Sequence, residues 1–70
     1  PMKAKQLEER CAAIEAEIEK LESEAAALDA QLMTQLMPDD ARKIVDAAAV
    51  KRSAIEKLTT EWEEISEQLA

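Results

Sequence analysis

Few side chains of this sequence could do chemistry, and they are spread over a strongly acidic chain. It holds 16 aspartates and glutamates, nine lysines and arginines, one cysteine and no histidine, for a net charge of −7. A catalytic or metal-binding use would need a base near a nucleophile, a glycine-rich phosphate loop or closely spaced zinc ligands. The sequence has none of these patterns, so we expect a chain that is not an enzyme and has no metal or cofactor. The carboxylates indicate a solvated helix face.

Two single side chains could still have a special role. Cys11 lies in an apolar repeat, where it is either a small buried hydrophobic residue or a reactive thiol. Trp62 is the only aromatic residue, and it is either a core residue or an anchor on a partner, because tryptophan is favoured in interfaces. A single cysteine cannot form an internal disulfide, which favours a reducing, cytoplasmic location.

The stretch Leu36–Asp40 lies near the middle of the chain and predicts a break between two helices. Its proline removes a backbone donor and disfavours helical angles at Met37. Proline is favoured in the first turn of a helix, where the two following aspartates place negative charge at the positive end of the helix. We therefore expect a single domain over residues 1–70, with one helix over 4–36, a hinge over 37–39 and a second helix over 40–69.

Apolar residues recur in both halves with steps of three and four, the heptad pattern of a coiled coil, in which positions a and d form the core. In the first half these positions are Leu7, Cys11, Ile14, Ile18, Leu21, Ala25, Leu28 and Leu32. In the second half they are Ile44, Ala48, Lys51, Ile55, Leu58, Trp62, Ile65 and Leu69. When the chain is folded at the hinge, every a residue of one half meets a d residue of the other. The sequence therefore predicts an all-α fold, an antiparallel two-helix coiled-coil hairpin.

Lys51 is the one polar core residue of this scheme, and we assign it to the control of register, a known use of a polar core position. Its aliphatic stem would pack opposite Ala25, while its ammonium group would reach Glu22 or Glu24. Arg52 is placed to meet Glu22 across the flank of the two helices.

The hinge end of the hairpin is one expected contact surface, and the open end with Trp62 is the other. Met33, Leu36 and Met37 form an apolar tip with Arg42 and Lys43 at its rim, and this half of the rod is less acidic than the other half. The tip is interpreted either as simple packing or as a contact with a large partner such as ribosomal RNA or protein. The candidate contact residues are Leu36, Met37, Arg42, Lys43 and Trp62.

Charge and hydropathy limit the other partners. The net charge of −7 argues against strong non-specific binding to nucleic acid and leaves room only for a local contact with RNA or DNA. No apolar run is long enough to cross a bilayer, so we expect no membrane contact. Two helices share one thin core, so the hairpin is expected to dock on a partner or to form a homodimer.

Three stretches are informative together: Cys11–Glu22 (CAAIEAEIEKLE), the proline-containing hinge, and Glu61–Ile65 (EWEEI). They resemble the C-terminal coiled-coil domain of F-subfamily ATP-binding cassette (ABC-F) proteins of the Uup type, over about residues 7–69. Members of that family are soluble ATPases with two nucleotide-binding domains. The resemblance implies a coiled-coil arm that acts in translation at the ribosome or on branched DNA, with the ATPase sites outside this chain.

Two functions follow as hypotheses. The first is a non-catalytic arm, resembling the ABC-F C-terminal domain, that positions or binds a partner at the ribosome or on nucleic acid. The alternative is a structural or oligomerisation module, a small hairpin that dimerises into a four-helix bundle. A tRNA-contacting arm of an aminoacyl-tRNA synthetase is disfavoured, because few basic residues line the rod. Since Pro1 does not correspond to a translation start, we expect either a native start at Met2 or a piece of a longer protein.

Overall fold

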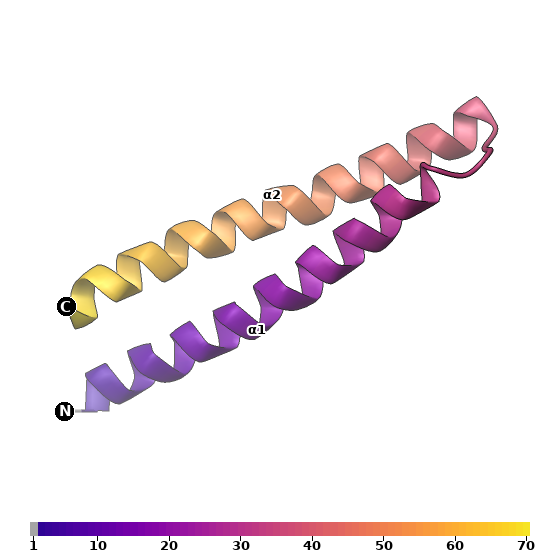
Figure 1. Ribbon diagram of the computed structural model, residues 1–70. Coiled ribbons are helices and arrows are strands. Elements are labelled where there is room, and N and C mark those ends of the chain that lie inside the picture. The colour runs from indigo at the N-terminus through magenta and orange to yellow at the C-terminus, as the bar shows by residue number, and fades with distance from the viewer. Residues whose placement is uncertain (1) are drawn as a thin grey trace.

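The computed structural model describes residues 2–70 and consists of two long helices. Helix α1 spans Met2–Gln31 and helix α2 spans Pro38–Leu69. They lie side by side in a rod of 55 × 14 × 14 Å, and the chain doubles back between them (Figure 1). We call the end that holds the start of α1 and the end of α2 the open end. The predicted all-α fold is confirmed, and residues 2–70 contain no strand.

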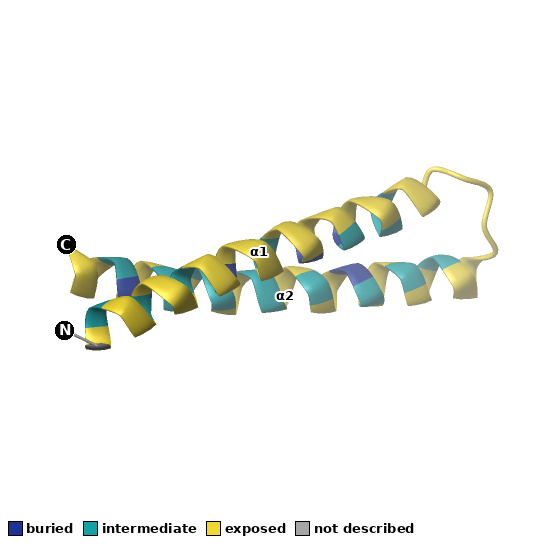
Figure 2. Ribbon diagram, turned by 90° about the horizontal axis from the view of Figure 1, so that it is seen from below, coloured by how far each residue is buried: buried dark blue, intermediate teal, exposed yellow. Residues whose placement is uncertain are grey.

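A narrow core runs between the helices, and the heptad pattern predicted its members. Its buried residues are Ile14, Leu21, Ala25, Ala48 and Ile65. The other predicted core positions are half-buried, except Leu69, which is exposed at the open end. Buried and half-buried residues follow the facing sides of the two helices, while the outer sides and the hinge are exposed (Figure 2). The apolar seam therefore holds the rod together, because burying apolar surface is the main favourable term in folding.

Ion pairs connect the two helices, and residues later in α1 pair with residues earlier in α2. Arg10, near the start of α1, contacts Glu61 near the end of α2. Arg52, nearer the hinge, contacts Asp29 in the last turns of α1. The expected partner of Arg52 was Glu22, and this prediction was wrong by one heptad. Asp29 lies on the same edge of α1 as Glu22, seven residues nearer the hinge, and it is the carboxylate that Arg52 contacts.

The first helix ends five residues earlier than the expected limit at Leu36, because its last turn tightens. The amide of Leu32 donates to the carbonyl of Asp29 at 3.1 Å, and the next two amides also reach back three residues. The hydroxyl of Thr34 donates to the carbonyl of Gln31 at 2.7 Å and competes with the helical pattern. The sequence has no glycine, and no residue in the described part has a positive φ. This tightened turn therefore ends the helix without a left-handed cap.

The second helix begins at Pro38, two residues before the expected start at Asp40. Met37 precedes it with extended angles of φ −67° and ψ 147°, as the residue before a proline should. The carbonyl of Met37 accepts the first helical hydrogen bond, from Ala41 at 3.0 Å. Asp39 and Asp40 occupy the first turn, where their charge favours the helix. The hinge therefore covers residues 32–37 and is longer than the three residues expected.

Candidate functional site

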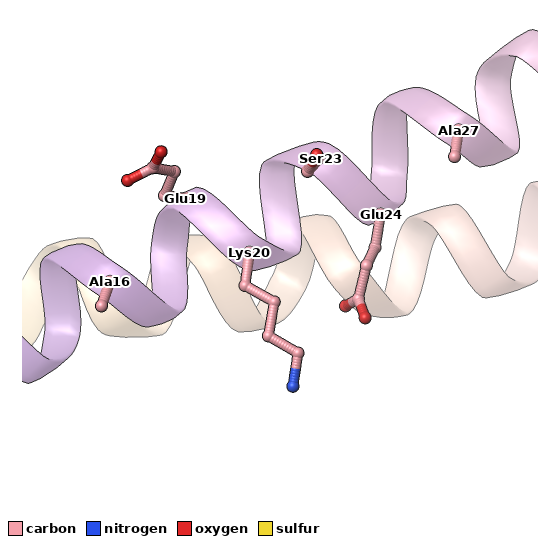
Figure 3. Close-up of a pocket in the computed structure, with 6 residues that line it drawn as sticks. All are labelled: Ala16, Glu19, Lys20, Ser23, Glu24 and Ala27. Atoms are coloured by element: carbon pink, nitrogen blue, oxygen red, sulfur yellow. The ribbon is translucent and has the colours of Figure 1, made fainter.

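The described residues line open hollows on the surface of the rod. No group of three or more histidine, cysteine, aspartate or glutamate residues among 2–70 is placed to hold a metal ion. One open hollow is lined by six residues of α1 alone: Ala16, Glu19, Lys20, Ser23, Glu24 and Ala27 (Figure 3). Since α2 contributes no wall to it, this hollow is the outer surface of a helix rather than a pocket.

The hinge tip carries the two most exposed large apolar side chains among the described residues, Met33 and Met37. Met33 is 88% exposed, Met37 is 71% exposed, and Leu36 is 37% exposed. All three lie within the six-residue hinge, and Leu36 is the least exposed of them. Two flexible methionine side chains at such a tip form an adaptable apolar surface. Leu36 and Met37 thus both lie at the exposed tip, and their contact with a partner stays a prediction.

The expected basic rim of the tip is present but is balanced by acidic side chains. Arg42 and Lys43 are exposed in the first turns of α2. Asp39 and Asp40 share these turns, and Asp46 follows one turn later. The tip is therefore apolar and close to neutral rather than basic.

Trp62 lies far from the tip, towards the open end. It is 24 residues beyond the start of α2, which places it about 36 Å along the helix at ~1.5 Å per residue. Its indole is half-buried, and Nε1 donates a hydrogen bond to Oε1 of Glu15 at 3.0 Å. The five predicted contact residues therefore form two separate surfaces, one at each end of the rod.

Lys51 lies half-buried on the core seam, and its ammonium reaches outwards. Its Nζ lies 3.1 Å from Oε1 of Glu24, one of the two expected partners. The reach of this side chain is thus confirmed, while its control of register stays a prediction.

Two cross-helix contacts near the open end were not anticipated. Arg10 and Glu61 form a two-point ion pair, and Trp62 binds Glu15. The signal was available in the heptad pattern, because Arg10 and Glu61 occupy equivalent flanking positions, which face each other when the helices run in opposite directions. The hydrogen bonds that Arg10 donates to Glu61 lower the pKa of Glu61 and raise the pKa of Arg10.

Cys11 is a free, half-buried thiol on the core seam of α1. This position fits the interpretation of a small hydrophobic residue at the edge of the core. Neither helix, over the residues described, is long and apolar enough to cross a membrane.

No protein-family model matches this sequence, and no curated protein or solved structure matches it. The resemblance to the ABC-F coiled-coil domain therefore rests on the sequence stretches alone and remains a prediction.

Proposed function

We propose that this chain is an antiparallel coiled-coil hairpin that works as a non-catalytic arm and contacts a large partner through its hinge tip. Its resemblance to the ABC-F C-terminal domain makes the ribosome the first partner to test. Two long helices that share a seam form a stiff rod, and a stiff rod presents its tip at a fixed distance from its base. The role of such an arm is to position or to bind.

The exposed apolar hinge is the observation that supports this proposal. A hinge needs only turn-forming, polar residues, yet this one carries Met33, Leu36 and Met37 in contact with solvent. Burying one methionine side chain is worth about 1.5–3 kcal/mol, so its exposure is unfavourable unless a partner covers it. The near-neutral charge of the tip also removes the repulsion that the acidic open half would exert on RNA.

Co-sedimentation with ribosomes tests this proposal. We expect the chain to pellet with ribosomes and Met33→Ser/Met37→Ser to lower retention by roughly tenfold or more. Val50→Ser is the matched control, because Val50 is 68% exposed on α2 and lies outside the hinge. A chain that stays in the supernatant, or equal losses in the two variants, would contradict an arm that acts at the ribosome through its tip.

Self-association into a four-helix bundle is the second candidate, and the exposed area favours it. The rod exposes 5446 Å², whereas a compact protein of 7.8 kDa exposes roughly 4,400 Å². The excess of roughly 1,000 Å² is similar to the ~800 Å² that one partner buries in a standard interface. Val50, exposed in the less acidic half, is the apolar side chain such an interface would cover.

Sedimentation equilibrium separates the two candidates. A monomer over the whole concentration range supports the arm and excludes the oligomerisation module. A stable dimer that Val50→Asp converts into a monomer supports the module.

A further inference from the structure

A groove beside Trp62 opens on one long side of the rod. It has a volume of about 200 Å³ and is lined by Glu15 and Ile18 of α1 and by Thr59 and Trp62 of α2. Ile18, Thr59 and Trp62 are half-buried, so each offers part of its surface to a partner. Glu15 accepts the indole hydrogen bond through Oε1, and its carboxylate has further lone pairs for a second donor.

Exposed glutamates border this groove on both helices. Glu8, Glu19 and Glu22 share an edge of α1 with Glu15, because their spacing of three, four and seven residues places them on one side of a helix. On α2, Glu56 and Glu63 lie on the same edge as Thr59. We call the groove together with these glutamates the Trp62 face. No lysine or arginine occupies this edge between residues 8 and 22 or between residues 56 and 66.

The opposite edge of the same stretch has balanced charge. It carries Arg10, Lys20 and Lys57 together with Glu17, Glu61 and Glu64. Arg10 and Glu61 are already paired there. The negative charge of the open half is therefore concentrated on the side that holds the tryptophan, and it is not a uniform property of the rod.

We infer that the Trp62 face is a docking surface for a lysine- or arginine-rich segment of a partner protein. A guanidinium or ammonium group is attracted to the face of an indole, and the strength of this attraction grows when water is excluded. The methylene stem of the same side chain can pack on Ile18 while its charged head reaches Glu15. Tryptophan, apolar wall and carboxylate together suit a long cationic side chain better than any other.

The length of the Trp62 face fits a short basic segment. Glu8 and Glu22 lie 14 residues apart on α1, or about 21 Å at ~1.5 Å per residue. An extended segment of about six residues spans ~20 Å at ~3.3 Å per residue. The same carboxylates repel nucleic acid, anionic membranes and the equivalent face of a second copy, so charge complementarity selects a basic polypeptide.

Trp62 fluorescence measures this binding directly, because no other aromatic residue emits. The probe is a hexa-arginine peptide, titrated into the full chain at low and at moderate ionic strength. We expect a saturable change in Trp62 emission, with an affinity that falls by tenfold or more as the salt rises. A single-stranded oligonucleotide should leave the emission unchanged. No response to the peptide, or a response to the oligonucleotide of the same size, overturns the inference.

Two variants that lose the same charge distinguish binding at the Trp62 face from attraction by the net charge of the chain. Glu19→Gln/Glu22→Gln removes two charges from the Trp62 face, and Glu17→Gln/Glu64→Gln removes two from the opposite edge. All four residues are exposed, and circular dichroism checks that both variants keep their helix content. We expect the first variant to lose at least tenfold in affinity for the peptide and the second to lose less than threefold. Equal losses would show attraction by net charge alone and would refute the proposed surface.

This inference does not depend on the hinge-tip contact. The hinge tip and the Trp62 face share no residue, and the methionine variants of the tip leave the Trp62 face intact. Retention on ribosomes and peptide binding can therefore fail separately, and each failure identifies which proposal is wrong.

Discussion

Arg10 and Glu61 clamp the open end of the rod through two parallel hydrogen bonds, from Nε to Oε2 at 2.7 Å and from Nη2 to Oε1 at 2.8 Å. The two residues are 51 positions apart in the sequence and join the start of α1 to the end of α2. A two-point arginine–carboxylate pair fixes orientation as well as distance. It therefore opposes separation of the two helices at the open end.

Stability should depend on pH through this clamp. The hydrogen bond from Arg10 lowers the pKa of Glu61 in the folded chain, so the unfolded chain binds a proton more readily. The stabilisation is complete above the ordinary glutamate pKa of about 4.3 and is lost as the pH falls through the lowered native value. We expect Glu61→Gln to melt at a lower temperature than the native chain near pH 7, with the difference vanishing in acid.

Thermal melting followed by circular dichroism from neutral to acidic pH measures this effect. Glu63→Gln is the matched control, since it removes the same charge from an exposed position two residues away. If both variants track the native chain at every pH, the clamp does not contribute to stability.

Ile14 is the most completely buried side chain, with no exposed surface. Ile14→Ala should cost about 2–5 kcal/mol, because the narrow seam leaves a cavity that cannot be refilled. A domain of this size has about 3–5 kcal/mol of stability from its core, so we expect the variant to be largely unfolded at room temperature. Val50→Ala, at a position 68% exposed, should melt like the native chain, and circular dichroism distinguishes the two results.

The sequence was sufficient to predict the core residues and the side of each helix that is buried. Ile14, Leu21, Ala25, Ala48 and Ile65 are all heptad positions, and a pattern that repeats over eight positions per helix leaves little freedom in choosing the buried side. Such periodicity identifies the residues that face the other helix, so a prediction of buried positions is correct wherever the helix is regular.

The hinge and the surface contacts were predicted less well, for a physical reason. The end of α1 is set by the hydroxyl of Thr34 and by the tightened turn at Leu32, which are local hydrogen bonds without a periodic signal. The choice of Asp29 over Glu22 by Arg52 depends on the reach of one long side chain. The energies of exposed pairs differ by less than about 1 kcal/mol, so the pattern alone does not select between them.

Lys51 should lower the stability of the hairpin while it restricts the two helices to a single register. Lys51→Leu places an apolar side chain at a half-buried core position and removes the ion pair with Glu24. Full burial of a leucine contributes about 1.5–3 kcal/mol, and a half-buried leucine gains only part of this. The loss of the pair is at most about 1 kcal/mol, so we expect a modestly higher melting temperature. We also expect new oligomers in sedimentation, since nothing polar then marks the register.

Lys57→Leu is the control for the general effect of an added leucine, because Lys57 is exposed. A Lys51→Leu chain that is no more stable and remains in its original oligomeric state would show that Lys51 has no part in setting the register.

The length of the hinge should control how the two helices meet. Helix axes in contact lie about 8–10 Å apart, and residues 32–37 must cross this gap while Met37 stays extended before Pro38. Deleting Gln35 and Leu36 leaves four residues, three of which belong to the tightened turn after α1. The chain must then unwind the last turn of α1 or shift α2, and either change breaks the contact between Arg52 and Asp29.

We expect a clear fall in melting temperature by circular dichroism, whereas Gln35→Ser/Leu36→Ser, which keeps the length, should melt like the native chain. An unchanged transition after the deletion would contradict the pairing of the helices described above, because a register fixed by the hinge cannot survive a hinge that is too short.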